Sequence, residues 1–144
     1  MSDNESRIRS MIEKRAATLE TGDAKAFLAY NAPEVVQYTL APPLRQVSDP
    51  RDPGPLERWL ATFEAPPRRE VTRLEIVAGA DVAYATSIDS LTAIPTGTTQ
   101  PFTLWHRVTL GLRRIDGEWL ITHEHQSVPF EMDGSLRASV DLQP

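Results

Sequence analysis

The residues best suited to chemistry gather in one stretch near the end of the chain, between residues 104 and 129. It holds every histidine in the sequence and two charged neighbours: His106, Arg107, His123, Glu124 and His125. Ionisable groups that stand where a sheet face would otherwise be apolar are candidates for a functional site. We therefore expect the site of this protein to be built on this segment.

Which of these side chains share a face depends on the turn between two predicted strands. If residues 115–117 form a three-residue loop with a bulge, His106 shares a face with Glu124 and Gln126. The opposite face then carries Arg107, Thr109, His123 and His125. We favour this register. In it, Glu124 is either a general base whose pKa is raised by burial or the partner of a protonated His106.

The alternative is a two-residue turn at Asp116 and Gly117, which places all three histidines on one face. His123 and His125 on one strand, with His106 as a third imidazole, would then form an open zinc site. We give this reading less weight, because no carboxylate is assured to orient each imidazole. We expect no metal.

A wider set of side chains is predicted to line a mostly apolar pocket with few polar groups, the usual form of a small-molecule site. Arg15 lies on the apolar stripe of the first predicted helix, where it either snorkels to solvent, the reading we favour, or faces a polar cavity. The predicted ligand-binding residues are Arg15, Tyr30, Tyr38, Trp59, Phe63, Trp105, Arg107, His123, His125 and Gln126.

These residues are placed by helices that come first and by strands that follow. Ser2 and Glu5 have the spacing of a capping box, and apolar residues then recur at helical intervals as far as Gly22. A segment with five prolines, residues 41–55, predicts a loop. We expect helices at about 3–20, 23–29 and 55–65, and strands at 35–40, 71–78, 82–94, 102–114 and 119–128.

Helices segregated from a run of antiparallel strands predict an α+β fold in which the helices cover one face of the sheet. A chain of 144 residues fits a single domain, 1–144. We expect its core to span about 6–130, and the tail, 131–144, to wrap the surface or a partner subunit.

Composition narrows the function. There is no cysteine, so thiolate chemistry is not available. The net charge of -5 opposes nucleic-acid binding, and we read Arg68–Arg69 and Arg113–Arg114 as solvated charges at strand ends. Without an apolar stretch long enough to span a membrane, and without nucleotide-binding glycine motifs, we predict a cytoplasmic protein with no cofactor.

Three segments carry a resemblance to a known family. They are Thr-Leu-Glu-Thr-Gly-Asp at 18–23, Phe-Leu-Ala-Tyr-Asn-Ala-Pro-Glu-Val-Val at 27–36, and Leu-Arg-Arg-Ile-Asp-Gly-Glu-Trp-Leu-Ile-Thr-His-Glu-His-Gln-Ser at 112–127. In this order the chain resembles the nuclear transport factor 2-like superfamily, in its SnoaL-like and ketosteroid-isomerase-like branch. The resemblance implies a cone-shaped, cystatin-like roll with a strongly curved antiparallel sheet, a pocket at its open end, and a homodimer formed through the sheet.

The steroid isomerases of this superfamily use an aspartate base, with a tyrosine and a protonated aspartic acid as oxyanion donors. By the resemblance, the tyrosine position falls on Arg15, the base on Thr39 or Tyr38, and the second acid near 106–108. None of these residue types is retained, so steroid isomerisation by that mechanism is not expected. Arg15 could instead stabilise an enolate or carboxylate.

Two functions remain open. The first is a cofactor-independent isomerase, cyclase or lyase for a small carbonyl- or carboxylate-bearing compound. In it Glu124 or His106 moves a proton, while Arg15 or Arg107 stabilises negative charge. The second is a non-catalytic dimeric module that binds a ligand or supports an assembly, in which the polar residues only satisfy one another.

Overall fold

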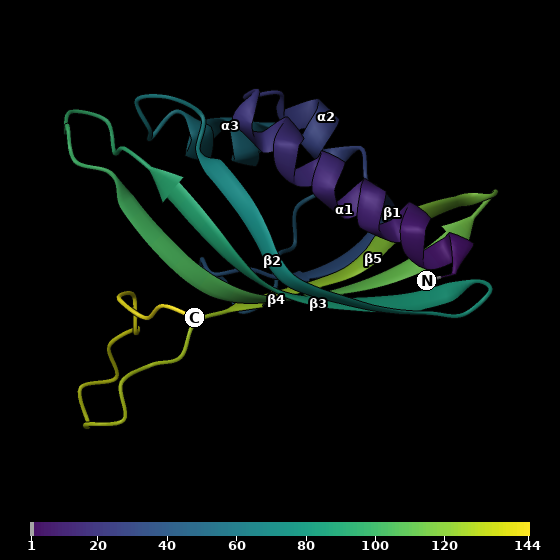
Figure 1. Ribbon diagram of the computed structural model, residues 1–144. Helices are drawn as coiled ribbons and strands as arrows, with labels where there is room; N and C mark the ends of the chain where they lie inside the picture. Colours follow the sequence, from purple (N-terminus) through teal and green to yellow (C-terminus); the bar gives the residue numbers. More distant parts are fainter. Residues whose placement is uncertain (1) are drawn as a thin grey trace.

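Three helices cover one face of a five-stranded sheet in the computed structural model, which describes residues 2–144 (Figure 1). This is the α+β class that the sequence predicts. The elements in chain order are α1 (Asp3–Glu20), α2 (Ala24–Leu28), β1 (Asn31–Tyr38), α3 (Gly54–Leu60), β2 (Arg68–Ala78), β3 (Val82–Ala93), β4 (Phe102–Ile115) and β5 (Glu118–Ser127).

Helix α1 begins and ends where its capping residues require. The Ser2 hydroxyl accepts a hydrogen bond from the backbone N–H of Glu5 at 3.1 Å, which satisfies one of the free donors of the first turn. After the last turn the chain reverses at Gly22, whose φ of 75° is a conformation that glycine adopts without strain. The apolar stripe of α1 packs on the sheet and carries the polar Arg15 with it.

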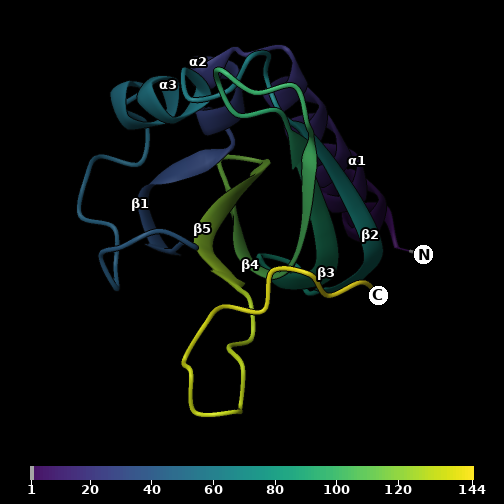
Figure 2. The same cartoon turned by 90° about the vertical axis from the view of Figure 1, so that its left-hand side faces the viewer.

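The sheet has the order β1-β5-β4-β3-β2 and is mixed, not purely antiparallel. Strands β2 to β5 form an antiparallel meander, as predicted, whereas β1 runs parallel to β5. The expectation of an entirely antiparallel sheet is therefore wrong at this edge. The sheet curls around the helices without closing into a barrel (Figure 2).

The turn between β4 and β5 has two residues, so the predicted three-residue loop is wrong. Asp116 and Gly117 both have positive φ, 51° and 83°, as the favoured two-residue hairpin turn requires. The bulge lies farther along β5, where the register shifts by one residue at Thr122, opposite Gly111. A Cβ on Gly111 would lie 3.0 Å from the Cβ of His123, so this position suits a glycine.

The bulge at Thr122 shifts the register of β5 by one residue, as the predicted bulge in the turn would have done. Leu110 pairs with Glu124, and two-residue alternation along each strand then puts His106, Glu124 and Gln126 on the face toward the helices. The opposite face carries Arg107, Thr109, His123 and His125. The grouping expected from the favoured register is confirmed, by a different turn and a different bulge.

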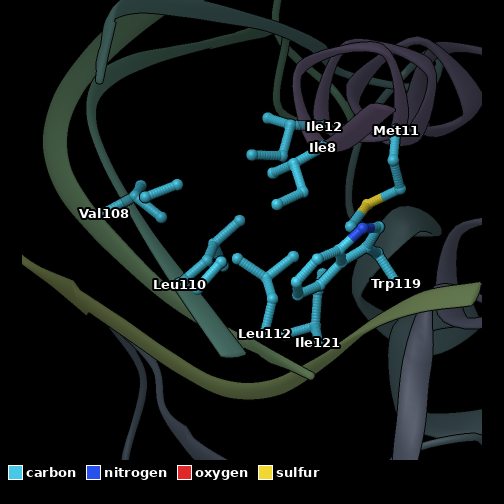
Figure 3. Close-up of a cluster of buried hydrophobic side chains, with 10 residues drawn as sticks. Ile8, Met11, Ile12, Val108, Leu110, Leu112, Trp119 and Ile121 are labelled. Carbon is cyan, nitrogen blue, oxygen red and sulfur yellow. The ribbon is translucent and has the colours of Figure 1, made fainter. Parts of the chain in front are cut away.

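The main core fills the space between α1 and the inner face of the sheet (Figure 3). Its members are Ile8, Met11, Ile12, Ala83, Ala85, Val108, Leu110, Leu112, Trp119 and Ile121. A second cluster, nearer α2, contains Leu19, Phe27, Leu28 and Leu91, with Leu56 and Leu60 of α3 against it. Among the described residues, no helix is both long and apolar enough to cross a membrane.

Candidate functional site

Five buried polar side chains from five different elements converge between the two apolar clusters. We call them the inner-face cluster: Arg15 of α1, Arg69 of β2, Asp89 of β3, His106 of β4 and Glu124 of β5. Burial of charged side chains is costly unless they are paired. Two ion pairs supply that pairing for four of the five side chains.

Arg15 and Glu124 form the central ion pair. The Nη2 atom of Arg15 donates to Oε1 of Glu124 at 2.8 Å, and the two residues are only 3% and 2% exposed. The Arg15 guanidinium also lies over the ring of Phe27, 4.4 Å from its centroid, a favourable cation–π position. The favoured expectation that Arg15 snorkels to solvent is therefore wrong; the side chain points inward, as the alternative of a polar cavity required, and there it meets Glu124.

Arg69 and Asp89 form a second ion pair beside the first. Nε and Nη2 of Arg69 both approach Oδ2 of Asp89, at 2.9 Å and 2.8 Å, while the Ser87 hydroxyl donates to Oδ1 at 2.7 Å. Nη2 of Arg69 also lies 3.8 Å from Oε2 of Glu124, which joins the two pairs. The reading of Arg69 as a solvated strand-end charge is wrong, since its side chain is 7% exposed; Arg68 beside it is exposed as predicted.

The charge on Glu124 is held by its partners. Burial alone would raise the pKa of this carboxyl, but Arg15 and then Arg69 outweigh burial and lower the pKa to about 2. The amide of Gln126 donates to its second oxygen at 3.0 Å and stabilises the same ionised form. The expectation of a pKa raised by burial is wrong, and near neutral pH Glu124 is a weak base.

His106 is the member of the cluster that has no ion pair. Burial lowers its pKa, and the positive charge of Arg69 acts in the same direction. The imidazole is therefore neutral near pH 7, and the expectation of a protonated His106 paired with Glu124 is wrong. Among residues 2–144, its Nδ1 atom has no hydrogen-bond partner, although the residue is only 5% exposed.

Several predicted ligand-binding residues lie on the outer face of the sheet, away from this cluster. Arg107 is exposed there and donates through Nε to the Ser127 hydroxyl at 3.0 Å. The rings of Tyr38, His123 and His125 pack edge to face on the same side, with centroids 5.2 Å to 6.4 Å apart. Trp105, next to His106 in β4, also points to this outer side.

This arrangement answers the zinc hypothesis. His106 faces the helices, whereas His123 and His125 face the other way, so the three imidazoles cannot share one ion. In the part of the chain that the structure describes, no three histidine, aspartate or glutamate side chains are placed as a metal site would need.

The remaining aromatic residues are divided between two other places. Trp59 and Phe63 stack edge to face at 5.0 Å near the end of α3, with Phe102 of β4 beside them at 6.1 Å from Phe63. Tyr30 lines an open groove of about 410 Å³ between α1 and the β4–β5 turn. The predicted aromatic set therefore does not line one pocket, and the groove contains no member of the inner-face cluster.

Sequence reasoning missed Asp89 and misjudged Arg69, although a signal for Asp89 is present. Along β3, every second residue faces the helices, and this row reads Ala83, Ala85, Ser87, Asp89 and Leu91. A carboxylate in an otherwise small and apolar row indicates a buried polar partner. No comparable pattern points to Arg69, because its place beside Asp89 is set by the β2–β3 register.

Several solved structures have a fold similar to that of this chain. An NTF2-like protein of unknown function from Pseudomonas putida is 27% identical, with 98% of this chain and 96% of that chain covered and a TM-score of 0.84. A provisionally named scytalone dehydratase from Novosphingobium aromaticivorans, 15% identical, covers 94% and 90% with a TM-score of 0.77. An uncharacterised cystatin-like protein from Caulobacter vibrioides, also 15% identical, covers 89% and 91% at 0.72.

These likenesses define an NTF2-like α+β roll, which is the fold that the sequence predicts. The model of the SnoaL-like domain matches residues 8–131, and the chain therefore belongs to the SnoaL-like domain family. No curated protein matches the chain. A fold shared by many functions does not by itself name a reaction, which depends on the residues of the site.

Proposed function

We propose that this protein is a cofactor-independent enzyme that moves a proton on a small carbonyl-bearing compound, with His106 as the catalytic residue. The observation that carries the proposal is a neutral, buried imidazole whose Nδ1 has no partner among residues 2–144, beside two ion pairs. A neutral imidazole can accept a proton near pH 7, as a general base must.

In this mechanism His106 removes a proton from the carbon next to the carbonyl group, and the electron pair moves to the carbonyl oxygen to give an enolate. Arg15 supplies the positive charge that stabilises the enolate. The proton then returns from His106 to another atom of the compound, as in an isomerase or cyclase, or to a departing group, as in a lyase. Glu124 is a positioning residue, because it holds the guanidinium of Arg15 in place.

Proton transfer can be tested before the substrate is known. A panel of small cyclic ketones in D2O, followed by proton NMR, reports exchange of the hydrogens next to the carbonyl. Wild-type protein should accelerate exchange for at least one ketone, and His106→Gln should lower that rate by a factor of about 100 or more, the usual range for a general base. Glutamine is of similar size and lacks a basic nitrogen.

The matched control is His125→Gln on the exposed outer face, which should exchange at the wild-type rate. This mechanism is rejected if wild-type protein accelerates hydrogen exchange for none of the ketones. It is also rejected if His106→Gln catalyses the exchange as fast as wild type does.

A non-catalytic ligand-binding homodimer is the second candidate, and one observation favours it. Each carboxylate of the inner-face cluster already has an arginine partner, so two cations and two anions balance without a ligand. In this case Gln126, at the half-buried side of the cluster, would contact a ligand that is bound and not converted. In either case we propose that the protein acts as a homodimer, formed through the outer face of the sheet.

A further inference from the structure

The groove between α1 and the β4–β5 turn is lined by residues that have no part in the inner-face cluster. Its main part has a volume of about 410 Å³, and a second part continues along α1. Arg7, Met11 and Tyr30 line both parts. A volume of several hundred Å³ is typical of a site for a small organic molecule.

One face of α1 supplies a wall of the groove that is partly cationic. Four lining residues recur at intervals of four, three and four positions, which places them in one row along the helix: Arg7, Met11, Lys14 and Thr18. Lys14 is exposed. Arg7 pairs through Nε with Asp3 at 3.0 Å, and both side chains are more than half exposed. Because exposed ion pairs of this kind are weak, both cations can attract an anion in the groove.

The opposite wall offers apolar surface. Tyr30 is half-buried there, and its position is fixed because its backbone carbonyl accepts a hydrogen bond from the Ile121 N–H at 2.9 Å. Ala26 and Ala29 add methyl groups to the same lining. An aromatic ring bound in the groove would therefore contact carbon atoms on this side.

Trp119 contributes a buried hydrogen-bond donor to the lining. The residue is 7% exposed, and within residues 2–144 its Nε1 atom has no acceptor. Figure 3 shows the indole nitrogen at the edge of the ring that faces α1, where Met11 lies. A buried N–H without an acceptor is costly, so a molecule that supplies one recovers free energy. The unbranched, flexible side chain of Met11 is the group that moves aside to admit it.

The charges and donors of the lining select a carboxylate as the polar end of the bound molecule. Its oxygens accept a hydrogen bond from the indole N–H and carry the negative charge that Arg7 and Lys14 attract. Glu118 also lines the groove and is exposed beside the β4–β5 turn, where it repels an anion. The carboxylate is therefore expected on the side of the groove that α1 forms.

We propose that this groove binds a small carboxylate that carries an aromatic ring. Arg7 and Lys14 attract the carboxylate by charge, and Trp119 donates to it from Nε1. His106 and the other members of the inner-face cluster lie outside the groove, so binding there is independent of the proposed proton transfer.

The test is a titration of full-length protein with 3-phenylpropionate, followed by proton–nitrogen NMR of the three tryptophan indole groups. Trp119→Phe identifies the Trp119 signal by its loss. In wild type this signal should shift and saturate, with a Kd below about 5 mM for a molecule of this size. The alcohol 3-phenylpropanol has the same ring without the charge. It should bind at least about tenfold more weakly, because hydrogen bonds to a charged group are stronger.

The binding variant combines Arg7→Ala with Lys14→Ala, two exposed positions where the fold tolerates the change. It should bind 3-phenylpropionate at least about tenfold more weakly. The matched control, Lys25→Ala with Arg113→Ala, removes two exposed cations that do not line the groove and should bind as wild type does.

Trp119→Phe keeps an aromatic ring and removes only the N–H donor. Its affinity for 3-phenylpropionate should fall by about tenfold, the value of one hydrogen bond to a charged group. The backbone amide signal of Gly117, which lines the groove, reports binding to this variant.

Four results would overturn the inference. One is the absence of a saturable shift of the Trp119 signal in wild type. A second is equal affinity for 3-phenylpropanol or for the Arg7→Ala, Lys14→Ala variant, since the cations would then not select a carboxylate. A third is an equal loss in the control variant, which would show that binding follows net charge alone. The fourth is loss of binding in His106→Gln, which should bind as wild type does; its loss would place the carboxylate in the inner-face cluster.

Discussion

At the scale of single residues, Arg15 and Glu124 have almost no contact with solvent, so neither charge can exchange its partner for water. A buried ion pair is not a strong source of stability, because both ions lose their hydration. Removing one member is different, because it leaves the other buried and unpaired. The pair therefore constrains substitution more than it stabilises the fold.

Glu124→Gln is expected to lower the free energy of unfolding by about 3 to 5 kcal/mol, because the buried Arg15 loses its counter-charge. Urea denaturation measures the change. The control is Glu118→Gln, an exposed glutamate on the same strand, which should change stability by no more than about 0.5 kcal/mol. A loss below about 1 kcal/mol for Glu124→Gln would mean that Asp89, the other carboxylate of the cluster, or water compensates for the missing negative charge.

His106 should make the protein less stable as the solution becomes acidic. Its pKa is lowered in the folded state, so the unfolded chain binds a proton first as the pH falls through about 6.5. The contribution of His106 to stability is therefore complete above that pH and is lost below it. The free energy of unfolding of wild-type protein, measured from about pH 7.5 to about pH 5.5, should fall more steeply than that of His106→Gln.

His125→Gln serves as the comparison for this pH series, because that imidazole is exposed on the outer face. The free energy of unfolding of His125→Gln should still fall with decreasing pH by the part that His106 contributes. Equal slopes for wild type and His106→Gln would show that the folded and unfolded states bind the proton equally well.

At the scale of elements, the bulge at Thr122 decides which residues of β5 reach the cluster. Before the bulge Trp119 and Ile121 point inward, and after it Glu124 and Gln126 do. Without the extra residue, alternation would turn Glu124 toward the outer face and leave Arg15 unpaired. The local backbone irregularity is thus a requirement of the buried ion pair.

Gly111→Ala should destabilise the protein by about 1 to 3 kcal/mol, the usual cost of forcing an extra methyl group into a packed site. The added Cβ would lie 3.0 Å from the Cβ of His123, which the bulge holds in place. Thermal unfolding measures the effect, with Thr109→Ala, an exposed position in the same strand, as a control near wild type. If Gly111→Ala is as stable as wild type, the bulge can shift to make room.

Sequence patterns within short segments predicted the helices and strands well. They predicted the pairing of the strands only in part. The bounds of α1 match the prediction because capping and chain reversal depend on residues adjacent in sequence, Ser2 and Gly22. The glycine at 111 within a strand was the available sign of a bulge. The parallel contact of β1 with β5 had no local sign, because it joins segments about ninety residues apart and depends on how the whole sheet curls.

At the scale of the molecule, the sequence predicted the site residues that lie on the β4–β5 hairpin. It did not predict how residues from α1, β2 and β3 join them. His106, Glu124 and Gln126 were grouped correctly, since strand alternation relates them. Their charge states were not, because these depend on Arg15 and Arg69, which reach the cluster only in the folded structure. A pKa is a property of the assembled surroundings and cannot be read from one segment.

The long separation in sequence between Arg15 and Glu124, 109 residues, also has a consequence for the order of folding. During synthesis α1 emerges early, and its apolar stripe cannot be buried favourably while the arginine within it lacks a counter-ion. Contacts of such high sequence separation form slowly, because a long loop must close first. We therefore expect the nascent chain to remain without its native core until β5 has left the ribosome, so that a chain arrested before residue 124 stays sensitive to protease.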